Sequence, residues 1–274
     1  MGYLSFPNAK INIGLQVTAK QENGYHSIES VFYPVPLHDA IEFILHPNQT
    51  TIHLSGIPIN EGAMNDNLCY KAWEILYKQY NIPYYDIFLH KNIPIGAGLG
   101  GGSSNGTCVL KELNKLNNLG LSTSTLSKLS KQLGSDCSFF IENKPCLVSG
   151  IGDLHTAIDL NLSGHHLVLV YPDIFISTPM AYANILPKPS EYSLQSAIAM
   201  PINQWKNNIV NDFEEWALNK HPDLQEIKDL MYSSGALYAS MSGSGSSMYA
   251  IFNQSPPQAL KEKINDYTAF IFEL

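Results

Sequence analysis

A short segment of the chain combines five glycines with three polar side chains. Residues 94–105 read Pro-Ile-Gly-Ala-Gly-Leu-Gly-Gly-Gly-Ser-Ser-Asn, between a strand-like apolar stretch at 85–90 and apolar residues at helical spacing over 107–116. Glycine lets backbone N–H groups approach an anion closely, and Ser or Asn at a helix start adds donors at the positive end of the helix dipole. The segment therefore predicts a phosphate-binding loop, with candidate contacts at Pro94, Gly96, Ala97, Gly98, Leu99, Gly100, Gly101, Gly102, Ser103, Ser104 and Asn105.

Three familiar phosphate-binding patterns do not fit this segment. The Walker pattern ends in Gly-Lys-Ser/Thr, and no lysine lies between Pro94 and Gly106. The dinucleotide fingerprint matches by letter, but it needs an acidic residue after a second strand about 20 residues further on, where this chain has the turn Asn117-Asn-Leu-Gly-Leu121. The His-Arg-Asp and Asp-Phe-Gly motifs of protein kinases are absent. These three classes are therefore excluded.

The charge composition restricts both the partners and the chemistry. The 274 residues carry a formal net charge of −8, which argues against a nucleic-acid or anionic-membrane surface. All 16 formal positive charges are lysines, so the chain offers neither a guanidinium clamp nor an arginine finger of its own. We therefore expect lysines, backbone amides, hydroxyls and metal ions to handle the phosphate.

The cysteines and the apolar segments predict a cytoplasmic location. None of the four cysteines forms a Cys-x-x-Cys pair or a His-Cys cluster with zinc spacing, which favours reduced thiols. The N-terminus has no basic region followed by an apolar core, and no apolar run reaches membrane-spanning length.

The order of the expected elements predicts two α+β halves that join near residue 155, with their functional loops facing a shared cleft. The first half begins with strands and continues with helices; the second starts at an apolar strand over 166–171. The expected strands are 9–17, 28–35, 40–45, 51–54, 85–90, 166–171, 236–241, 248–252 and 268–272. The expected helices are 67–80, 107–116, 122–133, 178–185, 192–199, 212–218, 224–233 and 257–264.

Four motifs taken together resemble the GHMP family of small-molecule kinases. They are Pro7-Asn-Ala-Lys-Ile-Asn12, the glycine run, Gly134-Ser-Asp136 and Met241-Ser-Gly-Ser-Gly-Ser-Ser247. The resemblance extends from residue 7 to about residue 252, and Gly24-Tyr25-His26 resembles the branch that phosphorylates a CDP-linked alcohol. It implies an α+β, two-domain GHMP kinase fold: a ribosomal-protein-S5-like N-terminal domain (1–155), a ferredoxin-like C-terminal domain (156–274) and an active site in the cleft between them.

The resemblance implies that Lys10 and Asp136 are the catalytic pair of a phosphoryl transfer from ATP to a hydroxyl. A carboxylate can accept the proton of the alcohol, while an ammonium group neutralises charge that develops on the γ-phosphate. Taken singly, Asp136 is more simply interpreted as a helix cap and Lys10 as a solvated strand residue. Asn12, two residues after Lys10 on the same strand face, is expected to orient the substrate hydroxyl.

Further residues are assigned to the two ligands by resemblance. For cytosine we expect Tyr25, His26 and Tyr182, and for polar or phosphate contacts Thr178, Gly243 and Ser244. The alternatives are a Pro-started helix for Thr178, a core aromatic for Tyr182 and a hairpin turn for the last loop. On the adenine side we expect Asn67, Leu68 and Lys91, where a helix cap and a surface lysine are the alternatives. Mg²⁺ is expected with ATP, without a dedicated carboxylate cage or protein metal site.

Two departures from the family pattern lie close to these residues. Gly106 replaces the usual alanine early in the expected helix, which should cost about 1 kcal/mol of helix stability. Cys137-Ser138 replaces Val-Pro after Asp136. The leading hypothesis is phosphorylation of the 2-hydroxyl of a CDP-linked methylerythritol in the non-mevalonate isoprenoid pathway, by a monomer or weak homodimer. The alternatives are another GHMP kinase, of homoserine or mevalonate type, and a non-catalytic nucleotide-binding sensor.

Overall fold

The computed structural model describes residues 2–22, 24–59, 64–190 and 192–274. The chain forms two compact units that are interleaved in sequence. The first unit comprises Met1–Lys10, Leu37–Ile95 and Gly100–Lys144, and the second comprises Ile11–Pro36, Gly96–Leu99 and Pro145–Leu274. The glycine run therefore belongs to both units, and a single domain boundary at residue 155 stays a prediction.

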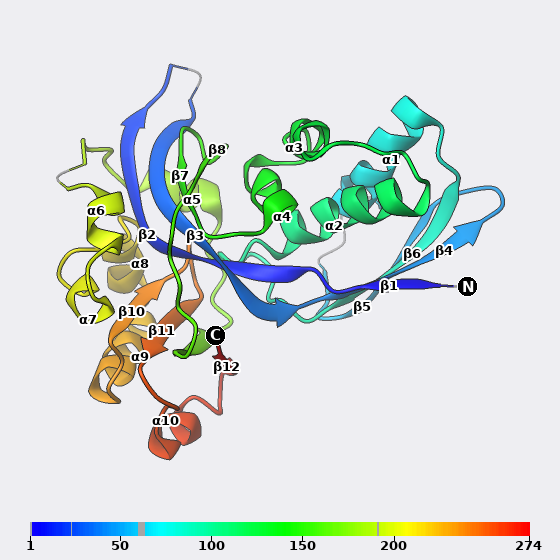
Figure 1. Ribbon diagram of the computed structural model, residues 1–274. Coiled ribbons are helices and arrows are strands. Elements are labelled where there is room, and N and C mark those ends of the chain that lie inside the picture. Colours follow the sequence, from blue (N-terminus) through cyan, green and yellow to red (C-terminus); the bar gives the residue numbers. More distant parts are fainter. Residues whose placement is uncertain (1, 23, 60–63, 191) are drawn as a thin grey trace. The chain divides into compact units, whose positions relative to one another are not determined.

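The first unit contains a four-stranded sheet made of β1, β4, β6 and β5 (Figure 1). Its alternating pattern buries one face, including Ile41, Phe43, Ile87 and Leu89, as expected for strands with one side on a core. The β4–β6 pair is antiparallel and the β5–β6 pair is parallel. The strand order is β1 (Tyr3–Ser5), β4 (Ala40–His46), β6 (Tyr84–Lys91) and β5 (Thr51–Gly56).

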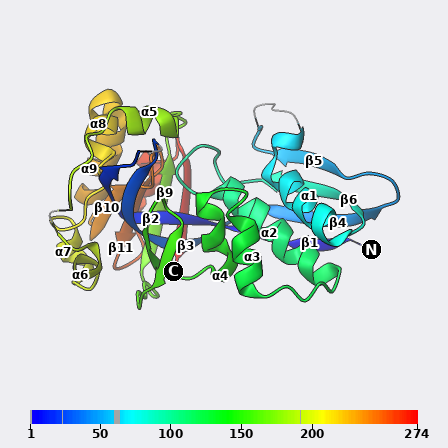
Figure 2. The ribbon, with the colours of Figure 1, turned by 90° about the horizontal axis from the view of Figure 1, so that it is seen from above.

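Helices cover the apolar face of this sheet, and α1 and α2 pack directly against each other (Figure 2). Trp73 and Leu76 of α1 and Leu110 and Leu113 of α2 lie in the same core cluster as the buried strand residues. The helical elements of this unit are η1 (Met64–Asp66), α1 (Leu68–Tyr80), α2 (Gly101–Leu116), α3 (Thr123–Ser130), η2 (Ser135–Ser138) and α4 (Phe139–Glu142).

Helix α2 begins earlier than the sequence pattern predicts, at Gly101 rather than Thr107. Gly100 takes the N-cap position with φ 68° and ψ 15°, a left-handed conformation that glycine adopts without steric cost. The apolar spacing starts at Thr107 because the first turn carries glycines and hydroxyls. Ser103, Ser104 and Asn105 are consequently inside the helix and do not precede it.

A second sheet contains the two longest strands, in the order β2 (Asn8–Lys20), β3 (His26–His38), β7 (Cys146–Ser149) and β8 (Leu154–Ala157). The strands β7 and β8 form an antiparallel hairpin around Gly150-Ile-Gly152. The sequence pattern did not predict this hairpin because each strand has only four residues, too few for an alternating pattern to stand out.

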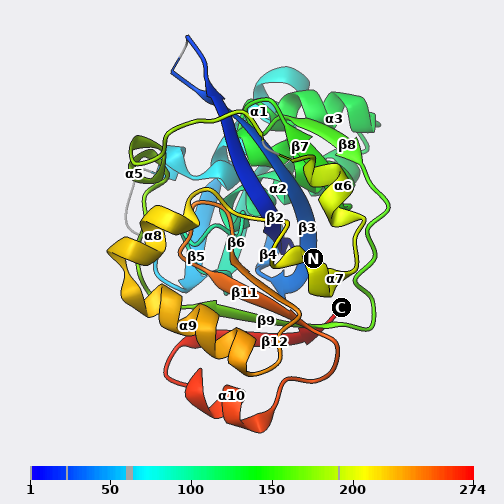
Figure 3. The same cartoon turned by 90° about the vertical axis from the view of Figure 1, so that its left-hand side faces the viewer.

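The third sheet lies in the second unit and confirms the predicted ferredoxin-like arrangement (Figure 3). Its order is β10 (Tyr238–Met241), β11 (Met248–Phe252), β9 (His166–Tyr171) and β12 (Thr268–Glu273), with antiparallel neighbours throughout. Helix α9 (Pro222–Ser233) precedes β10 and α10 (Gln258–Lys263) precedes β12, which gives the β-α-β-β-α-β order of that fold. Among the described residues, four shorter helices lie between β9 and α9: α5 (Thr178–Ala183), α6 (Leu194–Ile198), α7 (Ile202–Trp205) and α8 (Glu214–Lys220).

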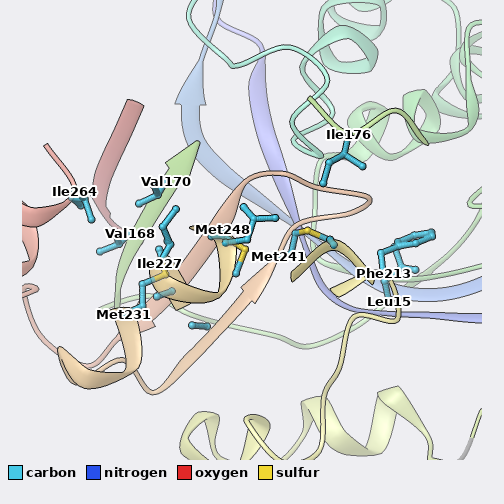
Figure 4. Close-up of a cluster of buried hydrophobic side chains, with 14 of the residues drawn as sticks. Leu15, Val168, Val170, Ile176, Phe213, Ile227, Met231, Met241, Met248 and Ile264 are labelled. Carbon is cyan, nitrogen blue, oxygen red and sulfur yellow. The ribbon is translucent and has the colours of Figure 1, made fainter. Parts of the chain in front are cut away.

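The core of the second unit forms where α9 and α10 meet this sheet (Figure 4). Val168 and Val170 of β9 and Met248 of β11 lie with Ile227 and Met231 of α9 in one buried cluster. The segments that end at Met241 and begin at Met248 are therefore anchored on both sides. The loop between them is held by a rigid support, as a binding loop requires.

Candidate active site

The first unit brings together Lys10 and Asp136, the two residues expected to be catalytic. The Lys10 Nζ lies 3.4 Å from the Asp136 Oδ2, with exposed side-chain fractions of 4% and 30%. Lys10 stands near the start of β2, and Asp136 lies in η2 directly after Gly134. Lys10 is thus buried, and the alternative of a solvated strand lysine is wrong.

The glycine run lies against the stem of this lysine. A methyl group built on Gly100 would come within 3.1 Å of the Lys10 Cε and the Lys10 Cγ. The half-exposed carboxylate, the buried ammonium and the N-cap of α2 are therefore neighbours. An alcohol beside this pair can pass its proton to the carboxylate, while the ammonium offsets negative charge.

The start of α2 is suited to an anion. The first intrahelical hydrogen bond runs from the Ser104 N–H to the Gly100 carbonyl at 2.9 Å. The N–H groups of Gly101, Gly102 and Ser103 precede it and have no partner within the helix, so they can donate to a phosphate. Gly102 is exposed and Ser103 is half-buried, whereas Ser104 and Asn105 are buried.

The part of the glycine run that belongs to the second unit, Gly96–Leu99, contacts the loop at residues 242–247 (the Ser-Gly loop). A Cβ on Gly98, which has φ 78°, would lie 1.9 Å from the Ser242 carbonyl oxygen. The Ser242 hydroxyl donates to the Gly98 carbonyl at 2.9 Å, and the Ser247 N–H donates to the Ala97 carbonyl at 3.3 Å. The glycine run and the Ser-Gly loop, which are separate motifs in the sequence, are therefore joined by direct hydrogen bonds.

Asn211, which is not among the predicted site residues, supports the Ser-Gly loop through its side chain. Its buried side-chain nitrogen donates to the carbonyls of Met241 and Gly243, each at 2.8 Å. Its Oδ1 accepts from the Phe213 N–H at 3.0 Å, so both ends of the amide are used. No signal in the sequence marked this residue, because its partners are backbone atoms about 30 residues away.

Asn12 is buried in β2, where its side-chain nitrogen donates to the Ser30 hydroxyl at 2.8 Å. Its Oδ1 faces Gly243, since a methyl group there would come within 3.2 Å of it. Asn12 thus meets the loop that carries Gly243 and Ser244. Its role in orienting a substrate hydroxyl stays a prediction.

Four of the residues expected to bind cytosine and diphosphate contact one another in the second unit, as the pairs His26–Tyr182 and Thr178–Ser244. The rings of His26 and Tyr182 are stacked, with centroids 4.7 Å apart and planes inclined by 20°. Burial, with a smaller contribution from Lys20, lowers the pKa of His26 below its ordinary value. The Thr178 Oγ1 and the Ser244 Oγ are 3.2 Å apart. Tyr25, just before β3, is 60% exposed.

Asn67 and Leu68 combine a structural contact with their expected ligand role. The Asn67 side chain caps α1 by accepting from the Cys69 N–H at 2.8 Å. Leu68 packs against α2, where a Cβ on Gly106 would lie 3.0 Å from the Leu68 Cβ. The glycine at position 106 therefore permits the close approach of the two helices. The helix-cap reading of Asn67 is confirmed, and its contact with adenine stays a prediction.

Lys91 is not a surface residue, so that alternative is wrong. It is buried at the end of β6, where its Nζ is ion-paired with the Asp39 carboxylate. The Lys91 Nζ also donates to the Asn105 Oδ1 at 3.0 Å. Asn105 is expected at the phosphate, but its side chain hydrogen-bonds to the buried residues Lys91 and Asp39. A direct contact between Lys91 and the nucleotide stays a prediction.

Cys137, one of the departures from the family pattern, is fully buried beside Asp136. Burial raises the pKa of its thiol to about 11. Its carbonyl accepts from the Thr107 hydroxyl of α2 at 2.8 Å, which ties η2 to that helix. The backbone of Cys137 therefore helps to fix η2, and with it Asp136, against α2.

Within the four described segments, no group of three or more His, Cys, Asp or Glu residues could hold a metal ion. Within the same segments, no helix is long and apolar enough to cross a membrane.

Two family profiles match separate parts of the chain. The family described as GHMP kinases N terminal domain matches residues 67–144, and the family described as GHMP kinases C terminal matches residues 197–269. The first range contains the glycine run and Asp136, and the second contains the Ser-Gly loop.

Relatives and a solved structure match over nearly the whole chain. The 4-diphosphocytidyl-2-C-methyl-D-erythritol kinase of Bacteroides fragilis is 45% identical over 273 residues, which cover 98% of each chain. The protein of the same name in Azobacteroides pseudotrichonymphae is 50% identical over 253 residues, 92% of this chain and 94% of the relative. A crystal structure of 4-(cytidine 5'-diphospho)-2C-methyl-D-erythritol kinase matches with a TM-score of 0.81 at 26% identity, covering 98% of both chains. The chain therefore belongs to the GHMP kinase family and, within it, to the group of 4-diphosphocytidyl-2-C-methyl-D-erythritol kinases.

Proposed function

We propose that the protein transfers the γ-phosphoryl group of ATP to the 2-hydroxyl of 4-diphosphocytidyl-2-C-methyl-D-erythritol. The products are the 2-phosphate and ADP, in the non-mevalonate route to isoprenoid precursors. The observation that carries this proposal is the Lys10–Asp136 pair, 3.4 Å apart against the glycine run, in a chain whose relatives bear the name of this kinase.

The transfer needs a base, a charge partner and a cradle for the phosphates. The substrate oxygen attacks the γ-phosphorus while the bond to the β–γ bridging oxygen breaks, and Asp136 takes the hydroxyl proton. Lys10 offsets the negative charge on the transferred group, and the N–H groups at the start of α2 hold the phosphates. Positioning and charge stabilisation therefore account for the catalysis, with no covalent enzyme intermediate.

Mg²⁺ is expected to enter with the nucleotide. It usually keeps several waters and takes few protein ligands beside phosphate oxygens, which suits a site with a half-buried hydroxyl at Ser103 and the partly exposed carboxylate of Asp136. When bound, the ion neutralises charge on the β- and γ-phosphates. The hydroxyls of Ser103 and Ser104 are the proposed contacts to phosphate or to the ion.

The cytosine and the diphosphate are assigned to the second unit. The proposed base partners are Tyr25, His26 and Tyr182, whose aromatic rings suit stacking on a planar base. Thr178, Gly243 and Ser244 supply a hydroxyl pair and a backbone turn for phosphate oxygens. Asn12 is proposed to orient the reacting hydroxyl. Asn67, Leu68 and Lys91 are assigned to the adenine side.

The remaining proposals concern the setting of the reaction. The substrate is a small molecule, and the net charge of −8 supports a protein without nucleic-acid or membrane partners. We propose that the protein acts in the cytoplasm as a monomer or weak homodimer, with domains at 1–155 and 156–274.

The test is ADP production from ATP and Mg²⁺ with the CDP-alcohol, beside homoserine, mevalonate and galactose. Wild type should use the CDP-alcohol alone. Asp136→Asn and Lys10→Met should each lower kcat by about 10²–10⁴-fold because they remove the base or its charge partner. Asp86→Asn, which removes a partly exposed carboxylate paired with His53, is the control and should keep full activity.

Each other result supports a named alternative. Turnover with homoserine or mevalonate alone would keep the family and refute the cytosine assignment. ATP binding without turnover of any alcohol, by folded wild-type protein, would favour the non-catalytic sensor. Full activity in Asp136→Asn would exclude this carboxylate as the base.

A further inference from the structure

A buried cluster of polar side chains lies under the first turn of α2, centred on Asp39. This residue stands between β3 and β4, and its side chain has an exposed fraction of 0%. Its carboxylate accepts from the backbone N–H groups of Asn92 at 2.7 Å and Ile93 at 2.8 Å, and from the Asn105 side chain at 2.9 Å. The Lys91 ammonium is its fourth donor. The carboxylate thus has donors for both oxygens and joins three separate segments of the chain.

Two of these segments lead into the glycine run. Asn92 and Ile93 directly precede Pro94, and Asn105 lies in the first turns of α2, so Asp39 holds both ends of the run. The Asp39 N–H also donates to the Pro7 carbonyl at 3.0 Å, just before Lys10. Asp39 therefore connects the approach to the loop and the helix that follows it through its side chain, and the segment before the catalytic lysine through its backbone N–H.

Lys91 places its charge close to the start of the helix. A methyl group built on Gly101 would come within 3.2 Å of the Lys91 Nζ. The ammonium also donates to the Asn105 Oδ1, so Asn105 is held by Asp39 and Lys91 together. Asp39 and Lys91 carry opposite charges, so the cluster has no net charge. Its effect on a nearby phosphate therefore comes from the positions in which it holds Lys91 and Asn105.

An ion pair this deeply buried is a poor way to gain stability alone. Desolvation offsets much of the Coulomb attraction, and well-packed apolar replacements are often as stable or more stable. The ion pair does fix the orientation of its members, because each donor must meet a particular carboxylate oxygen. Since the pair lies close to the start of the proposed phosphate-binding helix, this orientation can position the first turn of α2.

We propose that Asp39 is a positioning residue for nucleotide binding and phosphoryl transfer. Its carboxylate fixes Lys91 and Asn105, and through them the N–H groups of Gly101, Gly102 and Ser103 at the phosphates. The inference rests on the proposed function. It adds a residue that does not touch the substrate and that acts through the first turn of α2.

The test separates positioning from folding by removing the two charges together. Asp39→Asn and Lys91→Met each leave one buried charge without its counter-charge, so both should be clearly destabilised. The double variant Asp39→Asn/Lys91→Met removes that penalty and should recover a midpoint of urea unfolding near that of wild type. Glu112→Gln is the control: Glu112 lies on the same helix with a side-chain exposure of 8%, ion-paired with Lys115 three residues on.

The readout is the Kd of a non-hydrolysable ATP analogue, measured by calorimetry, together with KM for each substrate. The double variant should bind the analogue about tenfold more weakly, which corresponds to about 1.4 kcal/mol. Its KM for the CDP-alcohol should stay within about twofold of wild type, because the Asp39 contacts lie within the first unit and the proposed cytosine residues belong to the second. Glu112→Gln should bind the analogue as wild type does.

A double variant with recovered stability and wild-type affinity for the analogue would overturn the proposal. Asn105→Ala is measured in every case, because Lys91 is itself assigned to the adenine side: this variant leaves Asp39 and Lys91 in place and removes the side chain that links them to α2. Unchanged analogue affinity in folded Asn105→Ala would likewise refute it. The calorimetric arm needs no alcohol substrate, so a wild type that binds the analogue and ignores the CDP-alcohol refutes only the proposed reaction.

Discussion

The hydroxyl of Ser242 donates to the carbonyl of Gly98 at 2.9 Å, although the two residues are 144 positions apart in the chain. This hydrogen bond joins the glycine run to the Ser-Gly loop within the second unit. A loop expected at the nucleotide phosphates and a loop expected at the substrate are thus linked by a hydrogen bond from a side chain to the backbone. Changes on either side of this contact should affect the binding of both ligands.

Gly98→Ala should break this contact. The added methyl group meets the Ser242 carbonyl at 1.9 Å, and φ 78° is strained for alanine, so we expect a loss of about 3 kcal/mol in the free energy of unfolding. KM should rise for ATP and for the CDP-alcohol. Gly120→Ala is the matched control, because Gly120 has φ 62° with nothing within 4 Å of its added methyl group. Equal losses in both variants, from urea unfolding, would mean that only the backbone conformation matters.

Asn211→Ala should loosen the Ser-Gly loop without touching either ligand. Two buried carbonyls, those of Met241 and Gly243, lose their donor, which should cost about 1–3 kcal/mol of unfolding free energy. We expect KM for the CDP-alcohol to rise, because Gly243 and Ser244 are its proposed diphosphate contacts. Asn208→Ala, which removes an exposed hydrogen bond to the Gln204 carbonyl, should change neither quantity. An Asn211→Ala enzyme with unaltered KM would show that the loop keeps its shape without this support.

The pKa of His26 should rise when Tyr182 is replaced by alanine. Burial is the larger cause of the lowered pKa, and the stacked Tyr182 ring covers the imidazole. Proton NMR titration of the His26 ring measures this directly in both proteins. A pKa that falls further in Tyr182→Ala would contradict burial as the cause and indicate that the ring stabilises the imidazolium.

The same pKa shift makes stability depend on pH. The folded protein binds a proton at His26 less readily than the unfolded chain does. His26 therefore contributes no penalty above its ordinary pKa of about 6.5, and it destabilises the fold as the pH falls through that value. His26→Gln should remove this part of the decline in urea midpoint between pH 7.5 and pH 5.5, about one unit on either side of the ordinary pKa. An identical decline in both proteins would exclude His26 from it.

Gly106→Ala should not stabilise the protein, although it replaces a glycine within a helix. Helix propensity alone favours alanine by about 1 kcal/mol. The added methyl group would lie 3.0 Å from the Leu68 Cβ and 3.2 Å from the Leu68 carbonyl oxygen, so α1 and α2 must separate slightly. We expect a thermal midpoint equal to or below that of wild type. Leu68→Ala combined with Gly106→Ala keeps the Leu68 Cβ and carbonyl oxygen in place, so it should not lower the added cost of the alanine.

Local sequence was sufficient for most of the elements and for the proposed chemistry. The strands β9 and β11 have the predicted ends, and the N-cap of α1 is at Asn67 as expected. These predictions succeeded because alternation, helical spacing and capping are properties of neighbouring residues. The motifs around Lys10, the glycine run and Asp136 also indicated the family, because their residue types and spacing are local.

Tertiary structure alone decided which of these residues contact each other and which are occupied by ion pairs or hydrogen bonds within the protein. Lys91 was equally compatible with a surface position until Asp39, 52 residues earlier, supplied its counter-charge. The start of α2 at Gly101, the need for glycine at position 106 and the support from Asn211 all depend on partners far along the chain. Burial, ion pairing and close helix approach arise from contacts between distant segments, and a local pattern carries no information about which segments meet.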